Sequence, residues 1–394
     1  MRILQVHTRY RESGGEDTVV RAEAELLTRA GHDVIPYLAE NPVGMLSTAT
    51  SLAMSPWNPL TGRGLRVVVE RVRPDVVHVH NTWFSVSPSI LAAVDLGGRP
   101  VVATLHNYRL VCANGMLFRD GHTCEDCVGT HPWRGVRHRC YRGSVVASTA
   151  AASTIAVNRA LGTWNRHVRL FLTLNEFARQ RFIRGGVPAD KIRVKPNFVA
   201  DPGRRQLPPS QSKTVLFVGR IVAEKGIQRL LEAWHALGPT SLELVVIGDG
   251  PLRRTLERQE KWQALPTVRF TGPLAREAVR RWMLRSRALV FPSLLYEGQP
   301  MTVLEAFAAG LPVLASRQGG NAELLRAVAS GRWLAAPEEP AAWESGLRAL
   351  HDGGHVDEAG SQVRELYEER FTEQTGRRLL EEAYDAALSG ERCR

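Results

Sequence analysis

Two glutamates eight residues apart are the strongest candidates for chemistry in this sequence. Glu297 and Glu305 lie in the stretch 296–306, which follows the apolar run 288–292. That run is typical of a buried strand, and a proline and a glycine mark the two ends of a helix after it. The turn between strand and helix gathers backbone N–H groups and the positive end of a helix dipole, which suit a phosphate. A carboxylate there would accept hydrogen bonds from sugar hydroxyls.

Two cations flank a second turn of the same kind. Arg220 and Lys225 lie between the apolar run 214–218 and a helix predicted to begin near Gly226. Arginine offers a planar fork of donors and lysine a mobile point charge, so the pair could bind a diphosphate and stabilise it as a leaving group. The alternative is a pair of cations on a solvated surface.

Histidines follow two further predicted strands. His80 ends the alternating run 76–80, and His106 follows the buried run 100–105. A histidine at a strand end can contact a ligand hydroxyl or stabilise charge. The alternative is a ring whose hydrogen bonds are satisfied by a loop carbonyl.

A glycine pair follows the first apolar run, 3–6. Gly14 and Gly15 are expected in a loop before a helix that Glu16 and Asp17 open. Glycines let the backbone approach a ligand, and acidic residues favour a helix N-terminus. An ordinary turn has the same composition.

Four of the five cysteines fall in one segment, and they are Cys112, Cys124, Cys127 and Cys140. The two inner cysteines have the spacing of a metal-ligand pair, and the outer two could complete a closed, structural tetrahedral zinc site. Four free thiols packed in a loop fit the sequence equally well, and a reducing cytosol disfavours disulfides. The segment also carries a basic and aromatic cluster that could face an acceptor phosphate, a membrane or solvent: Trp133, Arg134, Arg137, Arg139, Tyr141 and Arg142.

The elements that position these residues alternate between apolar runs and amphipathic segments, which predicts parallel sheets covered on both faces. A chain of 394 residues is too long for one ordinary core and suits two domains. We expect loops or short helices over 41–64, a linker rich in Pro, Gln and Ser over 201–212, a loop over 318–323 and one terminal helix over 363–388.

Net charge and hydropathy limit the partners and the location that the chain can have. The formal charge of +11 would suit nucleic acid, anionic lipid or an anionic substrate, but no recognised nucleic-acid motif accompanies it. No apolar run approaches the roughly 18–20 residues that span a bilayer, and the N-terminus has no long apolar signal region. We therefore expect a cytoplasmic protein without a nucleic-acid partner. A basic surface would also suit peripheral binding at the anionic inner face of the plasma membrane, although a solvated basic face fits equally well.

Taken together, the motifs resemble those of retaining GT-B glycosyltransferases of family 4 (glycosyl transferases group 1), in the subset with a Cys-bearing insert. The stretch 296–306 is similar to the donor motif Glu-x7-Glu of that family. Four further segments follow in the order and spacing of the family, so that the match spans almost the whole chain: 218–226, 246–251, 270–274 and 310–313.

The resemblance implies an α/β protein of the GT-B fold, with two Rossmann-like parallel-sheet domains facing across a cleft. The implied parts are an acceptor-side domain 1–198 with a Cys-rich insert 107–143, a linker 199–212, a nucleotide-sugar-binding domain 213–370 and a helix 371–394 that crosses back to the first domain.

The resemblance also implies roles for single residues. Arg220 and Lys225 would hold the donor diphosphate, Glu305 would accept from ribose hydroxyls, and Glu297 with the amides after it would hold the donor sugar. His106 would lie near the reacting face without acting as the general base. The implied catalytic residues are His106, Glu297, Arg220 and Lys225, and the implied donor-binding residues are Gly14, Gly15, Arg220, Lys225, Gly272, Leu274, Glu297, Gly298, Gln299, Met301, Thr302 and Glu305.

The implied reaction is retaining transfer from a UDP- or GDP-linked sugar to a glycan, lipid-linked or other hydroxyl acceptor in cell-surface polysaccharide synthesis. The resemblance implies no metal for catalysis. The family often has Glu-Gly-Phe-Gly-Leu where this chain has Glu-Gly-Gln-Pro-Met from Glu297, and Pro300 has no N–H to offer the donor. Gln299 is the candidate substitute. A nucleotide-sugar epimerase and an inactive GT-B scaffold with a metal loop are the alternatives, and the intact phosphate segment and glutamate pair disfavour both.

Overall fold

The computed structural model describes residues 1–9, 14–263, 265–326, 328 and 331–391. The chain divides into two compact units. The N-terminal unit comprises Met1–Arg119, Cys124–Pro196 and Gly376–Arg394, and the C-terminal unit comprises Asp120–Thr123 and Asn197–Thr375. Each unit is built around one six-stranded parallel sheet, which confirms the predicted fold class of two parallel-sheet α/β domains.

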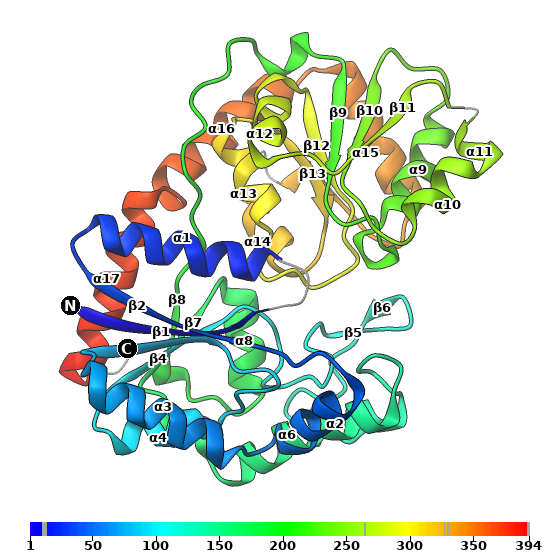
Figure 1. The fold of residues 1–394 in the computed structure, drawn as a ribbon. Helices are drawn as coiled ribbons and strands as arrows, with labels where there is room; N and C mark the ends of the chain where they lie inside the picture. The colour runs from blue at the N-terminus through cyan, green and yellow to red at the C-terminus, as the bar shows by residue number, and fades with distance from the viewer. Residues whose placement is uncertain (10–13, 264, 327, 329–330, 392–394) are drawn as a thin grey trace. The chain divides into compact units, whose positions relative to one another are not determined.

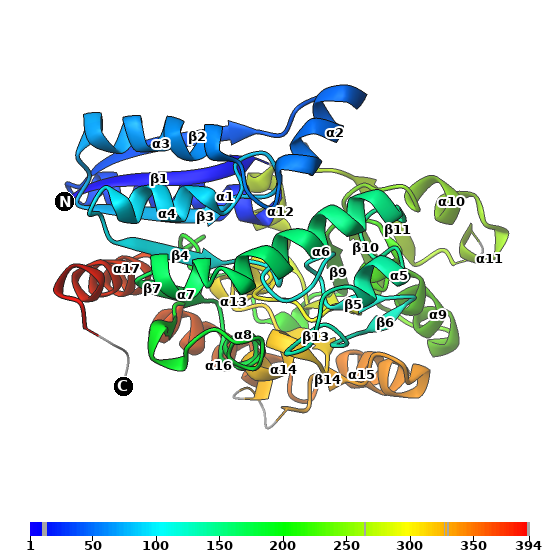
Figure 2. The same ribbon diagram turned by 90° about the horizontal axis from the view of Figure 1, so that it is seen from below.

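The sheet of the N-terminal unit has the order β2-β1-β3-β4-β7-β8. Its strands are β1 Arg2–Arg9, β2 Asp33–Glu40, β3 Val76–Asn81, β4 Val101–Leu105, β7 Leu170–Thr173 and β8 Ile192–Val194. The helices are α1 Gly15–Arg29, α2 Met45–Met54, α3 Pro59–Val72, α4 Ser89–Leu96, α6 Val145–Ala160, α7 Thr163–His167 and α8 Glu176–Arg184, followed by the 3-10 turn η1 Ala189–Lys191. Figure 1 shows α1 on one face of this sheet and α3 and α4 on the other. Figure 2 shows α3 and α4 side by side.

Local sequence explains where two of these helices begin. Gly14 is the N-cap of α1, and its N–H donates to Asp17 Oδ2 at 2.9 Å. Asn175 is the N-cap of α8, where its Oδ1 accepts from the N–H of Ala178 at 2.7 Å. Both contacts satisfy donors that a helix leaves without an internal partner. Gly15 is thus the first helical residue, not part of the loop expected for it.

The sheet of the C-terminal unit has the order β11-β10-β9-β12-β13-β14. Its strands are β9 Thr214–Val218, β10 Glu243–Ile247, β11 Val268–Gly272, β12 Ala288–Phe291, β13 Val313–Ser316 and β14 Leu334–Ala335. The helices are α9 Ile227–Leu237, α10 Arg253–Arg258, α11 Glu260–Gln263, α12 Arg276–Arg285, α13 Met301–Ala308, α14 Gly319–Arg326, α15 Pro340–Asp352 and α16 Val356–Arg370, with 3-10 turns η2 Pro209–Gln211 and η3 Ala223–Lys225. Helices α9 and α15 pack side by side (Figure 1).

Two local predictions were wrong. Residues 318–323 were expected to form a loop, but α14 begins at Gly319. Two glycines at its start have low helix propensity, and burial of Leu324 and Leu325 stabilises the helix nonetheless. The single terminal helix expected over 363–388 is two helices, α16 and α17 Glu373–Ser389, separated at Phe371, whose fully buried ring packs in the core of the C-terminal unit.

Residues 41–64, expected as loops or short helices, form α2 and the first part of α3. The Cys-rich insert has little regular structure: β5 Phe118–Arg119, β6 His122–Thr123 and α5 Arg134–Arg137.

Helix α17 belongs almost entirely to the N-terminal unit, although its sequence follows the C-terminal unit. Leu380 and Tyr384 pack in one core with Ile3 and Val102, and the ring nitrogen Nδ1 of His78 lies 2.8 Å from the Tyr384 hydroxyl. In the part of the chain that the structure describes, no helix is both long and apolar enough to cross a bilayer.

Candidate functional site

Lys225 and Glu297 meet at the carboxyl end of the C-terminal sheet. Lys225 ends the turn η3 after β9, and Glu297 lies between β12 and α13. The Lys225 ammonium donates to Glu297 Oε1 at 2.6 Å, and the Ser293 hydroxyl donates to the same oxygen at 2.5 Å. The two side chains are 24% and 13% exposed, so this ion pair is partly shielded but reachable. Two residues that the sequence placed in different motifs are therefore in direct contact.

Gly226 makes that contact possible. It has φ +71°, and a Cβ atom here would clash with the carbonyl of Pro292. A glycine is required both for the backbone conformation and for the close approach of the two loops. The turn after β9 thus packs directly on the segment after β12. Arg220 is exposed in the same turn, and the N–H of Ile221 donates to the Asp249 carbonyl at 2.8 Å, tying this turn to the loop after β10.

Glu305 lies in the middle of α13 and is bound by an arginine of the neighbouring helix α12. Arg276, the first residue of α12, donates to Glu305 Oε1 through Nη2 at 3.2 Å and Nε at 3.3 Å. Burial raises the pKa of Glu305, and Arg276 and Arg280 oppose that rise. No spacing rule would have found Arg276, because it is 29 residues away from its partner.

Gln299 was predicted to substitute for the amide that Pro300 lacks. Its side chain is buried, and its Oε1 accepts from the backbone N–H of Asn197 within the same unit. The carboxamide oxygen of Gln299 therefore joins the loop before α13 to the backbone at Asn197. Pro300 is the N-cap of α13, so Met301 and Thr302 supply the first N–H groups that the helix itself does not use.

The remaining predicted donor residues lie at the same sheet edge. Gly272 is the last residue of β11, Leu274 follows it half-buried, and Gly298 precedes α13. The carboxyl ends of parallel strands are where open α/β sheets bind ligands. Gly14 and Gly15, by contrast, belong to the N-terminal unit.

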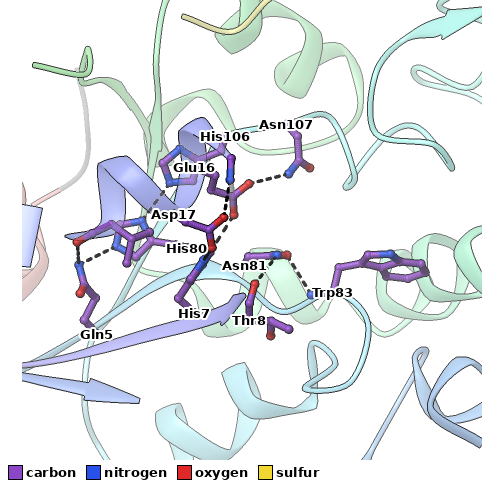
Figure 3. Close-up of polar contacts among 12 residues, drawn as sticks. Gln5, His7, Thr8, Glu16, Asp17, His80, Asn81, Trp83, His106 and Asn107 are labelled. Carbon is purple, nitrogen blue, oxygen red and sulfur yellow. Dashed lines mark hydrogen bonds and ion pairs between the residues drawn. The ribbon is translucent and has the colours of Figure 1, made fainter. Parts of the chain in front are cut away.

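In the N-terminal unit, the start of α1 is bound to the ends of the strands (Figure 3). The Asp17 carboxylate lies 2.9 Å from His7 Nε2 on β1, and Glu16 accepts from the Asn107 carboxamide at 3.3 Å. Gly14 caps this helix through Asp17, so the glycine pair and the strand ends form one polar cluster.

His106 stacks on His80, with the ring centroids 5.3 Å apart and His106 Nε2 at 3.0 Å from His80 Nδ1 (Figure 3). Burial holds the pKa of both rings well below its usual range, and the neighbouring histidines and Lys195 lower it further. Both imidazoles are therefore neutral near pH 7. As a neutral ring, His106 can form hydrogen bonds to a ligand. Sequence reasoning missed His7 of this cluster.

A buried ion pair lies next to the histidine cluster. Lys195 and Glu23 are 1% and 0% exposed, and Lys195 Nζ donates to Glu23 Oε1. Glu23 Oε2 lies 3.7 Å from His80 Nε2. Glu23 lies four residues after Val19 and four before Leu27, on the apolar face of α1, and that spacing is a signal from which its burial could have been predicted.

Glu23, His78 and His80 have ligand atoms within 4.8 Å of one another, a spacing that could hold a metal ion. The other contacts of these residues disfavour one. The His78 ring nitrogens lie 2.8 Å from the Tyr384 and Thr104 hydroxyls, and burial lowers the pKa of His78 to about 3. The Lys195 ammonium already pairs with Glu23. We describe this cluster as a buried polar network.

The four clustered cysteines line one small cavity of about 20 Å³, together with Arg119, Asp126 and Arg134. They form no disulfide. Cys112 donates through Sγ to Asn114 Oδ1 at 2.9 Å. Burial and the neighbouring thiols raise the pKa of Cys127 to about 11. Among the described residues, no three of these sulfurs lie within 4.8 Å of one another.

Comparison with known families gives two matches. The model described as Glycosyltransferase Family 4 matches residues 13–201, and the model described as Glycosyl transferases group 1 matches residues 212–352. A curated relative, glycogen synthase of Mycobacterium tuberculosis, is 27% identical over 330 residues, which cover 81% of this chain and 70% of the relative.

Solved structures match over nearly the full length. Alr3699/HepE of Anabaena, in complex with UDP, gives a TM-score of 0.71 at 16% identity and covers 98% of this chain and 100% of its own. Sucrose-phosphate synthase of Thermosynechococcus elongatus gives 0.70 at 16% identity and covers 99% and 100%. These neighbours have the GT-B fold, and the predicted GT-B fold is thereby confirmed.

Proposed function

We propose that this chain, a glycosyltransferase of the GT-B fold, transfers a sugar from a UDP- or GDP-linked donor to a hydroxyl acceptor with retention of configuration. The two family models support the glycosyltransferase assignment over most of the chain. The observation that carries the proposal is the contact between Lys225 and Glu297 at the carboxyl end of the C-terminal sheet. Support for the donor class comes from the neighbour of Anabaena, which was solved with UDP-glucose.

In this proposal the C-terminal unit binds the donor. The Arg220 guanidinium and the Lys225 ammonium neutralise the diphosphate, and they stabilise it as it leaves. The free N–H groups at the start of α13 add the positive end of a helix dipole. Glu297 orients Lys225 and accepts from the sugar hydroxyls, and Glu305 accepts from the ribose. With two cations on the diphosphate, the reaction needs no metal ion.

The bond from the anomeric carbon to the diphosphate breaks as the acceptor hydroxyl approaches from the same face. The hydroxyl oxygen forms the new bond to the anomeric carbon, and its proton passes to an oxygen of the leaving diphosphate, so the chain supplies neither a nucleophile nor a general base. His106, held neutral in the N-terminal unit, offers a hydrogen bond near the reacting groups.

For the acceptor, we propose a growing glycan or a lipid-linked sugar in cell-surface polysaccharide synthesis. A chain with a formal charge of +11 suits an anionic lipid surface. Three apolar side chains at the start of α2 are strongly exposed: Val43 86%, Met45 92% and Leu46 83%. They would support peripheral binding at the inner face of the plasma membrane.

Binding of the donor nucleotide is the direct test. We expect one of UDP, GDP, dTDP and ADP to raise the unfolding temperature of the full chain, because a ligand at about 100 times its dissociation constant adds about 2.7 kcal/mol to stability. Differential scanning fluorimetry with each nucleotide measures it. A failure of all four would contradict the proposal and favour an inactive scaffold, whereas epimerised donor without transfer would identify an epimerase.

We also propose that Cys112, Cys124, Cys127 and Cys140 hold a structural zinc ion. Four thiolates are a common zinc ligand set, and the cavity that they share shows that the fold brings them together. Zn–S distances are about 2.3 Å. Rotation of the cysteine side chains would therefore have to bring the four sulfurs closer to one another than they are in this structure. The ion would bind the irregular insert together and would take no part in catalysis.

The metal content of the purified chain tests this. We expect about one zinc ion per chain by plasma mass spectrometry, and its loss in Cys124→Ser and Cys127→Ser, because each variant removes one of four ligands. The insert should then become sensitive to limited proteolysis. Cys393→Ser, at the one cysteine outside the described residues, is the matched control. Metal-free protein with four readily titrated thiols would contradict the proposal.

A further inference from the structure

The N-terminal unit contains a pocket that the proposed donor chemistry does not use. It encloses about 80 Å³ beside the carboxyl ends of β3 and β4. Its walls are mainly apolar, with Leu91, Ala151 and Phe171 among them, and the partly exposed polar residues that line it include His106, Asn107 and Arg109. Because a cavity of about 10–15 Å³ on this measure holds one water, the pocket has room for a group of several atoms.

Arg109 is held in this pocket by two aromatic rings. Its Cζ lies 5.4 Å from the centroid of Trp83 and 5.6 Å from that of Tyr141. The Trp83 indole donates to the Tyr141 hydroxyl at 2.9 Å, which fixes the rings relative to each other. Gly115 leaves room for the arginine stem, since a Cβ there would lie 2.8 Å from Arg109 Cγ. The guanidinium is therefore positioned before any ligand arrives.

Two nitrogens of this guanidinium lack an acceptor. Nε and Nη1 of Arg109 are buried without a hydrogen-bond partner. Within the described part of the chain Arg109 forms no ion pair, and the residues that line the pocket include no carboxylate. A buried donor without an acceptor is destabilising, more so when it is charged. The contacts of Arg109 hold its position and leave its charge without a counter-ion.

We infer that this pocket binds a carboxylate or phosphate group and that the Arg109 guanidinium recognises it. The planar fork of arginine matches two oxygens of either group. If the chain is the glycosyltransferase proposed above, the anion belongs to the acceptor, which is then an acidic sugar or a sugar phosphate. That last step rests on the proposed function, whereas the anion site itself does not.

Binding of small probes to the full chain tests the site. The probes are glucuronate, inorganic phosphate and neutral glucose, and isothermal titration calorimetry measures the affinity of each. We expect glucuronate, phosphate or both to bind at least tenfold more weakly to Arg109→Met, because the two donors are lost. Arg137→Met, at an exposed arginine of the same insert, should bind like the wild type.

Two further controls separate the outcomes. Phosphate is also titrated against Lys225→Ala, so that binding at the donor site is recognised. Arg109→Lys keeps the charge without the fork, and intermediate affinity in a folded protein shows that the loss in Arg109→Met is not misfolding. Unchanged affinity of both anions in Arg109→Met would overturn the inference. If no nucleotide stabilises the wild type but the anions depend on Arg109, the proposed function fails and the anion site stands.

Discussion

Lys225→Ala is expected to lower the turnover of sugar transfer by about 100- to 1,000-fold. Removing one preorganised donor from a developing oxyanion costs about that much in other enzymes. The Lys225 ammonium contacts Glu297 directly, and its side chain is partly shielded, so bulk water cannot replace it fully. The measurement is release of nucleoside diphosphate from the donor found by thermal unfolding. Lys213→Ala, at an exposed lysine just before β9, is the matched control.

The variant Glu297→Gln distinguishes the contribution of Glu297 from that of Lys225. The variant keeps the volume of the side chain and leaves Lys225 available, so nucleotide binding should persist while turnover falls. Lys225→Ala should lose both. Turnover within about twofold of the wild type in both variants, with the control unchanged, would exclude this contact as the centre of the reaction.

Glu23→Gln is expected to destabilise the N-terminal unit by about 3–5 kcal/mol. The substitution leaves the Lys195 ammonium, which is 1% exposed, buried without its carboxylate. Glu25→Gln, at an exposed position on the same helix, should change stability by less than about 0.5 kcal/mol. Urea unfolding, followed by a probe in the N-terminal unit, measures the difference.

The double variant Glu23→Met/Lys195→Met gives the sharper result. Replacing a buried pair by apolar residues of similar volume is often neutral or stabilising, so the double variant should recover most of the stability that Glu23→Gln loses. If the double variant were as unstable as the single one, the loss would arise from packing, and the unpaired charge would not be its cause.

The sequence was most informative where strands end. Apolar runs located β3, β4, β9 and β12, and parallel pairing then brought the residues after them to one edge of each sheet. For that reason the segments that carry Lys225 and Glu297 could be placed at strand ends, whereas the contact between the two side chains was not predicted. Helix α14 was missed because its first two residues are glycines, and only its packing on the core makes it helical.

Partners far apart in sequence could not be predicted. Lys195 and Glu23 are 172 residues apart, and no periodicity connects them. Arg276 and Arg109 look like other arginines of a basic chain, and only the packed structure shows that one binds Glu305 while the other lies between Trp83 and Tyr141. The four cysteines were found by spacing, because they lie close together along the chain.

The place of α17 has a consequence for biosynthesis. Tyr384 and Leu380 complete the core around Ile3, yet the ribosome makes them after the whole C-terminal unit. During translation, His78 and the apolar residues around it stay exposed until α17 leaves the ribosome. The core of the N-terminal unit is therefore completed only after the C-terminal unit has been made, and a chain that stopped before α17 would leave that apolar surface exposed.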